Sequence, residues 1–237
     1  MARLFDDALT QYLFNATTPI TAAPLSMGCW FYADNDALEL ALMFVGDTAS
    51  NQNYWSLFLQ GGGGADDVSL RAREAAGFTD VATTTNYTIN TWHYASCSVV
   101  AVDDRDVYID GGSKGSSAVA RTPAGVDAMS VGVTYRLAPH QYMSGRIKWP
   151  AIWNVALDDD EHAALATGIP PILVRPQSLV TWIYDDNDFD YVGGYDLTAV
   201  NSPTTAADPT LLYRGGRMHP PSGLFRRKSE HVMGRCR

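Results

Sequence analysis

The sequence predicts an all-β fold, an antiparallel β-sandwich or jelly roll with one short helix. Short apolar segments recur along the chain, and turn-forming residues separate them at the spacing of roughly 8 to 12 residues that sandwiches show. One segment alone has the features of a helix start. No repeat of fixed period is visible, which disfavours a propeller or a solenoid.

The first third of the chain is expected to supply four or more strands. Residues 11–34 contain two apolar runs around a Thr-Pro turn, and residues 38–47 and 53–60 follow as apolar strands separated by a polar loop. The four glycines at 61–64 indicate a flexible connection, because glycine has no side chain to pack. Residues 68–72 then alternate between apolar and polar, which predicts a strand with one wet face.

The middle of the chain predicts a hairpin. Residues 92–102 form a mostly apolar strand, residues 103–105 form an acidic turn, and residues 107–109 return antiparallel. The Asp-Gly-Gly at 110–112 then makes a second tight turn, since such turns need the positive φ that glycine adopts freely.

The aromatic residues are expected mainly in the core. Trp92 and Trp153 should be large plugs between the two sheets, and His93 should point to the opposite, wetter face because neighbours alternate along a strand. Nothing in the sequence selects an exposed platform for sugar rings. The tyrosines considered for that role are Tyr54, Tyr135, Tyr142 and Tyr191.

The last third predicts two more strands and the helix. Strands at 128–135 and 142–157 lead to a helix of about two turns, which Asp158 or Asp159 caps and Gly168 follows. Three prolines then bound a stiff link to a strand at 178–185.

The charge is unevenly distributed. The net charge is −9; residues 214–237 contain seven basic residues and one acidic residue, or +6, which leaves −15 for residues 1–213. Glycines and prolines prevent regular structure in this basic tail. We therefore predict a sandwich at 1–192 and an extended arm at 193–237 that docks on an acidic partner. The expected docking residues are Arg214, Arg217, Arg226, Arg227, Lys228, Arg235 and Arg237.

Composition excludes several classes of protein. Hydrophobic residues make up 46% of the chain, enough to bury a core, yet no apolar run approaches the roughly 18 to 20 residues that span a membrane. Acidic residues near the start occupy the place of a signal peptide's apolar core. Three scattered cysteines cannot form a disulfide framework or a zinc site, and we expect Cys29 and Cys97 to be small core residues.

No reactive constellation is visible, so we predict that the chain is not an enzyme. The paired carboxylates of sandwich glycosidases, spaced as Glu-x-Asp-x-x-Glu, are missing from the sequence. The Gly-x-Ser-x-Gly match around Ser113 is not followed by a helix, so Ser113 is expected in a turn. Asp185, Asp186 and Asp188 are weak candidates for a Ca²⁺ site, against a solvated acidic turn; no other cofactor is expected.

Three segments together resemble a known family. They are TWHYASCSVV, DRDVYIDGG and GRIKWPAIWNVALDDDEHAALATG, and the similarity extends over roughly residues 8 to 168. In this order they resemble the LamG-like, concanavalin A-like jelly-roll family, in which a Trp-His strand, a Tyr-Ile-Asp-Gly turn and a Trp-Asn before a helix recur. The resemblance implies a jelly-roll sandwich and extends to the compact LamG-like proteins of bacterial viruses.

The resemblance implies a virion structural protein, such as a capsid decoration protein at the particle surface. The basic arm would dock on a neighbouring coat subunit, and the protein, made in the host cytoplasm, would be a homo-oligomer, a trimer by analogy. The alternative is a glycan-binding module for adhesion, assisted by calcium. Nucleic acid is not expected as a partner, because the basic triplet at 226–228 lacks interleaved aromatic residues.

Overall fold

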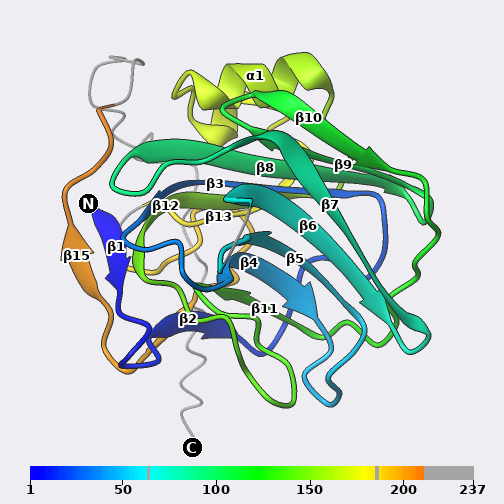
Figure 1. Cartoon of the computed structure of the whole chain (residues 1–237), viewed down its shortest axis with the longest axis horizontal. Helices are drawn as coiled ribbons and strands as arrows, with labels where there is room; N and C mark the ends of the chain where they lie inside the picture. The colour runs from blue at the N-terminus through cyan, green and yellow to red at the C-terminus, as the bar shows by residue number, and fades with distance from the viewer. Residues whose placement is uncertain (63–64, 185–186, 211–237) are drawn as a thin grey trace, which may run out of the picture.

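The computed structural model describes residues 1–62, 65–184 and 187–210, and within them two antiparallel sheets pack face to face (Figure 1). The predicted all-β sandwich with one short helix is therefore confirmed. The eight-stranded sheet contains β1 (Ala2–Phe5), β3 (Leu25–Ala33), β8 (Trp92–Ala101), β9 (Asp104–Ile109), β10 (Gly112–Ser117), β12 (Gly145–Trp153), β13 (Leu179–Trp182) and β15 (Thr204–Ala206). The seven-stranded sheet contains β2 (Tyr12–Asn15), β4 (Leu40–Gly46), β5 (Tyr54–Leu59), β6 (Asp67–Glu74), β7 (Gly77–Asn86), β11 (Ala128–Val131) and β14 (Thr198–Val200).

The strand order brings distant parts of the chain together. The eight-stranded sheet runs β10-β9-β8-β3-β12-β1-β15, with β13 also paired to β12, and the seven-stranded sheet runs β14-β2-β11-β4-β5-β6-β7. The last two strands extend the two sheets: β14 pairs with β2 in the seven-stranded sheet, and β15 pairs with β1 in the eight-stranded sheet. Residues 198–200 and 204–206 of the range predicted as an arm are thus strands of the two sheets.

The core between the sheets follows the two-residue period of the strands. Along β8, the alternate residues Ala95, Cys97 and Val99 face the core. Cys29 is buried there too, so the prediction for these two cysteines is confirmed, and burial raises the pKa of Cys97 to about 12.

Trp92 and His93 lie opposite to the prediction. His93 pairs with core-facing Phe31 across β3 and β8, and its side chain is 13% exposed. Trp92 is on the outer face, half-buried against Tyr32. The size of Trp92 suggested burial. However, Ala95, Cys97 and Val99 of the same strand face the core, so by alternation residue 93 also faces it and residue 92 does not. Trp153 is buried as predicted, although in a second cluster outside the eight-stranded sheet.

That second cluster forms under the helix. The helix α1 (Asp159–Ala166) and the short 3₁₀ helix η1 (Pro171–Leu173) follow β12, and α1 lies on the outer side of the eight-stranded sheet beside β8 and β10 (Figure 1). A capping box starts α1 as predicted: Glu161 N donates to Asp158 Oδ1 and Asp158 N donates to Glu161 Oε2, each at 2.9 Å.

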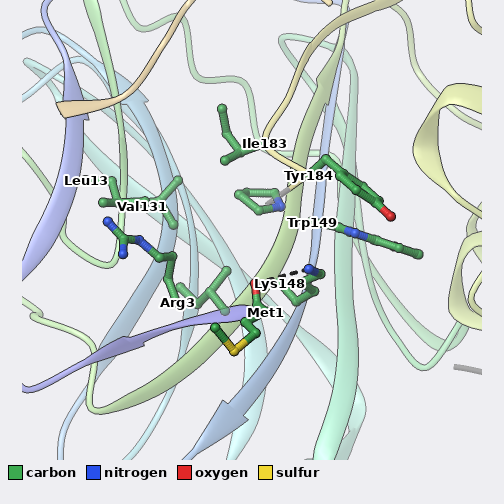
Figure 2. Close-up of a pocket in the computed structure, with 10 residues that line it drawn as sticks. Met1, Arg3, Leu13, Val131, Lys148, Trp149, Ile183 and Tyr184 are labelled. Carbon is green, nitrogen blue, oxygen red and sulfur yellow. Dashed lines mark hydrogen bonds between the residues drawn. The ribbon is translucent and has the colours of Figure 1, made fainter. Parts of the chain in front are cut away.

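A buried lysine of β12 holds the start of the chain and the segment after β15 together. Lys148 Nζ, almost fully buried, donates to the carbonyl of Met1 at 3.1 Å (Figure 2). It also lies 3.3 Å from Asp208 Oδ1. The same end of the sandwich encloses a cavity of about 10 Å³ beside Arg3 and Trp149, which has room for about one water molecule. No helix in the described part of the chain is long and apolar enough to cross a membrane.

Candidate functional site

The outer face of the seven-stranded sheet has a loop packed against it. Residues 132–144 connect β11 to β12, and the Thr134 hydroxyl of this loop lies 3.3 Å from the hydroxyl of Ser56, which points outward from β5. Tyr135 of the same loop packs on Phe14 of β2, with ring centroids 4.0 Å apart. The loop therefore supplies side chains to this face that the strands alone do not have.

An aromatic cluster forms where the loop crosses β2. Tyr12 lies 5.5 Å from Tyr135 and 6.1 Å from Tyr142 between ring centroids, and all three rings are half-buried. Burial raises the pKa of Tyr12, and the neighbouring phenols of Tyr135 and Tyr142 raise it further. The Tyr12 hydroxyl is therefore protonated at neutral pH and can donate a hydrogen bond.

A groove of about 380 Å³ opens beside this cluster, with Tyr142 in its wall. Its polar side chains are held in place by one another: Gln141 Nε2 donates to Glu39 Oε2, and the Thr134 hydroxyl donates to Gln141 Oε1 at 2.7 Å. Burial and then the charge of Arg136 lower the pKa of His140, which is neutral at pH 7. The groove is lined by Asp7, Leu38, Glu39, His140, Gln141 and Tyr142.

Three arginines lie on the same face beyond the groove. Arg71 of β6 makes a bidentate pair with Asp80 of β7, at 2.7 Å for both contacts, and also reaches Glu39 at 3.5 Å. Arg73, two residues along β6, lies over the ring of Phe78, and Arg136 donates to the carbonyl of Asn51 at 3.2 Å. Within the described residues, neither Arg73 nor Arg136 forms an ion pair.

A larger hollow, of about 600 Å³, opens on the opposite side of the molecule beside α1. Lys114 Nζ lies 2.9 Å from Asp106 Oδ2 and 3.1 Å from Asp159 Oδ1, and Tyr108 donates to Asp159 Oδ1 at 2.7 Å. The only aromatic residue in its lining, Tyr108, is buried. This hollow has paired charges but no exposed ring on which a sugar could stack.

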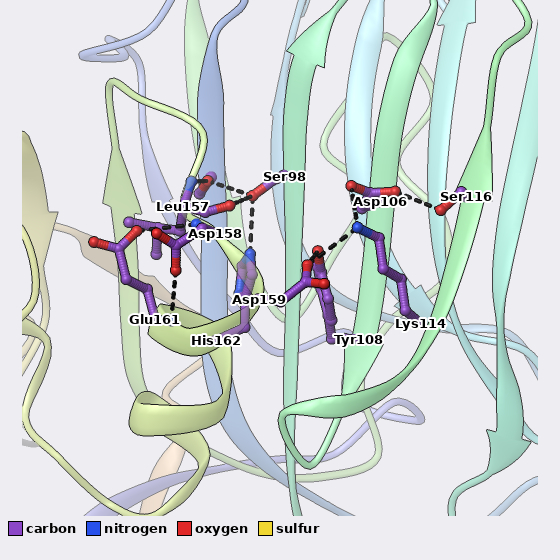
Figure 3. A network of polar contacts seen from close by, with 11 residues as sticks. Ser98, Asp106, Tyr108, Lys114, Ser116, Leu157, Asp158, Asp159, Glu161 and His162 are labelled. Carbon is purple, nitrogen blue, oxygen red and sulfur yellow. Dashed lines mark hydrogen bonds and ion pairs between the residues drawn. The ribbon is translucent and has the colours of Figure 1, made fainter.

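A serine and a histidine meet under α1 at a distance typical of a catalytic pair. Ser98 Oγ lies 2.8 Å from His162 Nε2 (Figure 3), but the two residues are 1% and 0% exposed, and Ser98 also contacts the carbonyl of Leu157. Burial lowers the pKa of His162 to about 4. No substrate can reach this pair, so it fastens the helix to the sheet.

The residues predicted as a metal site are only partly described. Asp188 is buried and its carboxylate pairs with Arg3, while Asp185 and Asp186 lie outside the described residues. No group of three or more histidine, cysteine or acidic side chains is placed to hold a metal ion anywhere in the described ranges. Ser113 was predicted in a turn but lies in β10, where its φ of 49° accompanies an irregularity in the pairing with β9 between Gly112 and Gly115. The predicted arm residues Arg214, Arg217, Arg226, Arg227, Lys228, Arg235 and Arg237 also lie outside the described residues.

Two of the four tyrosines considered from the sequence reach the groove or its aromatic cluster, namely Tyr135 and Tyr142. Tyr54 is fully buried, and Tyr191 packs with Trp182 in the cluster under η1. The sequence analysis missed the arginines, although residues 68–72 predicted a wet face on that strand. Also missed were Tyr12, Phe14, Glu39, Arg71, Arg73, Arg136, His140 and Gln141.

Comparison with known structures finds the same fold. A candidate carbohydrate-binding protein from Bacteroides ovatus aligns at TM-score 0.59 and 15% identity, over 86% of this chain and 58% of that one. A SAP-like pentraxin from Limulus polyphemus aligns at TM-score 0.56 and 10% identity, over 82% and 87%. Domain 4 of AbnA, an extracellular GH43 arabinanase from Geobacillus stearothermophilus solved with arabinotriose, aligns at TM-score 0.53 and 20% identity, over 62% and 68%.

A comparison with curated protein sequences finds no match. The Laminin_G_3 family profile, described as the concanavalin A-like lectin/glucanases superfamily, matches residues 6–161. That match covers well over half of the sequence, including most strands of both sheets. The chain therefore belongs to the concanavalin A-like lectin/glucanases superfamily.

Proposed function

We propose that this protein is a non-catalytic carbohydrate-binding module and that the groove at Tyr142 is its saccharide site. The observation behind the proposal is the combination of a half-buried tyrosine ring with fixed amide, carboxylate and imidazole groups in one groove. A sugar ring has an apolar face of C–H groups and a rim of hydroxyls. An aromatic ring complements the face, and planar polar side chains complement the rim.

The groove favours binding over hydrolysis. Glycosidases of the common type need two carboxyl groups that flank the scissile bond, one of them protonated. Of the two carboxylates in the groove, Glu39 is already engaged by both Gln141 and Arg71. It acts as part of the wall and positions the amide of Gln141.

The similar structures support a saccharide as the ligand. Among them are an arabinanase domain solved with arabinotriose and a candidate carbohydrate-binding protein. At 15 to 20% identity these relatives share the fold alone, so the choice of sugar has to come from this chain's own residues.

The virion role expected from the sequence stays a prediction, as do the coat-protein partner and the trimer. Its expected docking residues all lie beyond residue 210, outside the described part of the chain. A saccharide-binding module is compatible with a position on a particle surface. The groove supports saccharide binding and gives no information on where the protein is located.

The proposal is tested by affinity electrophoresis and calorimetry with a panel of polysaccharides. Replacing Tyr142 by alanine should weaken binding at least about tenfold, equivalent to about 1.4 kcal/mol, because the stacking surface is lost. Tyr32→Ala is the matched control, since Tyr32 is also half-buried but lies on the other sheet. Failure of the folded protein to bind any polysaccharide, or equal losses in both variants, would overturn the proposal.

A further inference from the structure

The arginines beside the groove are unusual for this protein because its body is strongly acidic. Residues 1–213 have 10 basic and 25 acidic residues. Nevertheless Arg71, Arg73 and Arg136 gather on the outer face of one sheet, close enough to affect one another. Burial lowers the pKa of Arg136, and although Tyr54 opposes this shift, the charges of Arg73 and Arg71 lower it further.

Two of these three cations lack an anionic partner in the described structure. Asp80 and Glu39 both pair with Arg71, which leaves Arg73 with an aromatic contact and Arg136 with one neutral carbonyl. Both residues are half-buried, so part of their hydration is lost. Partly buried charges without partners are costly, and an anion placed between them would offset that cost.

The two arginines are themselves hydrogen-bond donors. Tyr54 faces Arg73 across the β5–β6 pair but is 0% exposed, so its hydroxyl is out of a ligand's reach and the donors are those of the guanidinium groups. A guanidinium group can only donate hydrogen bonds, and its fork matches the two oxygens of a carboxylate or sulfate. Chemistry of this kind selects an acceptor with a negative charge.

The arginine pair and the groove belong to one continuous surface. Arg136 and His140 lie four residues apart in the same loop, and the charge of Arg136 is felt at His140 in the groove wall. Glu39, also in the wall, contacts Arg71, the neighbour of Arg73 on β6. A saccharide longer than one ring can therefore lie in the groove and extend toward the arginines.

We propose that the saccharide is acidic, with a carboxylate or sulfate group bound by Arg73 and Arg136 while a sugar ring stacks on Tyr142. This inference rests on the proposed function and specifies the class of ligand. The competing explanation is structural: Arg73 only packs on the exposed ring of Phe78, at 5.6 Å, and Arg136 only fastens its loop through the carbonyl of Asn51.

The test uses charged polysaccharides paired with neutral forms of the same backbone. Calorimetry on the full chain compares polygalacturonate with its methyl ester and chondroitin sulfate with its desulfated form, as part of a wider panel built in the same way. At least one acidic form should bind about tenfold more tightly than its neutral counterpart, and binding should weaken as salt screens the contact. Inorganic sulfate alone should bind far more weakly, since it lacks the ring.

Variants separate this inference from the proposed function. The double variant Arg73→Gln and Arg136→Gln should lose the preference for the acidic form and keep binding of the neutral form, whereas Tyr142→Ala should lose both. Arg146→Gln, at a half-buried arginine over Tyr32 on the other sheet, should change neither.

Four outcomes would overturn the inference, and only one of them would also overturn the proposed function. Equal binding of acidic and neutral forms, or an unchanged preference in the double variant, would overturn the inference and leave the carbohydrate-binding function standing. Sulfate binding as tightly as the polysaccharide would also overturn it, because the site would then be a simple anion site. No binding to any member of the panel would overturn both proposals.

Discussion

Acidification should release α1 from the sheet through His162. The folded protein lowers the pKa of this histidine from 6.5 to about 4, chiefly by burial, whereas the unfolded chain has the ordinary value. Between these two pH values the unfolded state binds more protons, so stability falls as the pH falls. The stabilisation is fully present above pH 6.5 and is lost on the way down to pH 4. At 1.36 kcal/mol per pH unit, the loss amounts to about 3 kcal/mol.

The contacts of the imidazole explain why protonation is unfavourable. His162 is 0% exposed, its ring stacks on Tyr108 at 4.1 Å between centroids, and Nε2 meets the hydroxyl of Ser98. A proton added here would place a charge where water is excluded, and the opposing effect of the Asp159, Asp106 and Asp158 carboxylates is smaller than that of burial.

Urea unfolding at pH 7 and pH 4 measures the effect, with His162→Gln as the comparison. The glutamine is neutral at both pH values, so the variant should lose about 3 kcal/mol less than the natural protein over the same interval. Carboxylates titrate in both proteins, and their contribution cancels in the difference. An equally steep pH dependence in the variant would refute this account of His162.

Three further predictions concern stability. Gly111→Ala should destabilise the fold by more than about 1 kcal/mol in urea unfolding, because a Cβ there would lie 2.6 Å from a Cα of α1 at a φ of +73°, whereas Gly112→Ala, with nothing within 4 Å, should cost less. Arg105→Met should cost about 2 to 4 kcal/mol in the same assay, since this buried guanidinium satisfies two loop carbonyls at 2.6 and 2.7 Å. Removing residues 211–237 should leave the melting temperature unchanged, because every strand of the described residues ends at or before residue 206.

The fold was predictable where strands are buried on both sides, and less so at the edges. The sequence analysis found the apolar segments of β3, β4, β5, β8 and β12, which lie in sheet interiors. It missed other strands at or near the sheet edges. Such a strand does not need a full apolar face, and edge strands are often short and polar because this discourages pairing with other molecules. Those missed are β1, β7, β10, β14 and β15, of which β10 reads GSKGSS and β14 and β15 have three residues each.

The groove could not be predicted because its parts are far apart in the sequence. Glu39 and Gln141 are separated by 102 positions, and only the packing of the 132–144 loop over the sheet brings them together. No local pattern distinguishes Tyr142, at the groove, from Tyr54, which is buried on the same face. The alternation of Arg71 and Arg73 with apolar residues could be seen in the sequence. Without the 132–144 loop it indicates a solvent-exposed strand face and not a binding site.

The two outer faces of the sandwich differ in how completely their polar groups are paired, and this difference determines where binding and stability reside. Beside α1, Lys114 is matched by two aspartates and His162 is held neutral, so substitutions there should change the free energy of unfolding and leave saccharide affinity intact. On the opposite outer face, Arg73 of β6 and Arg136 of the 132–144 loop lack ion-pair partners within the described residues. Their replacement by glutamine removes repulsion between like charges, so it should leave stability unchanged or slightly raised while affinity for an acidic ligand falls. A loss of affinity accompanied by a gain in stability is the expected signature of residues retained for a ligand.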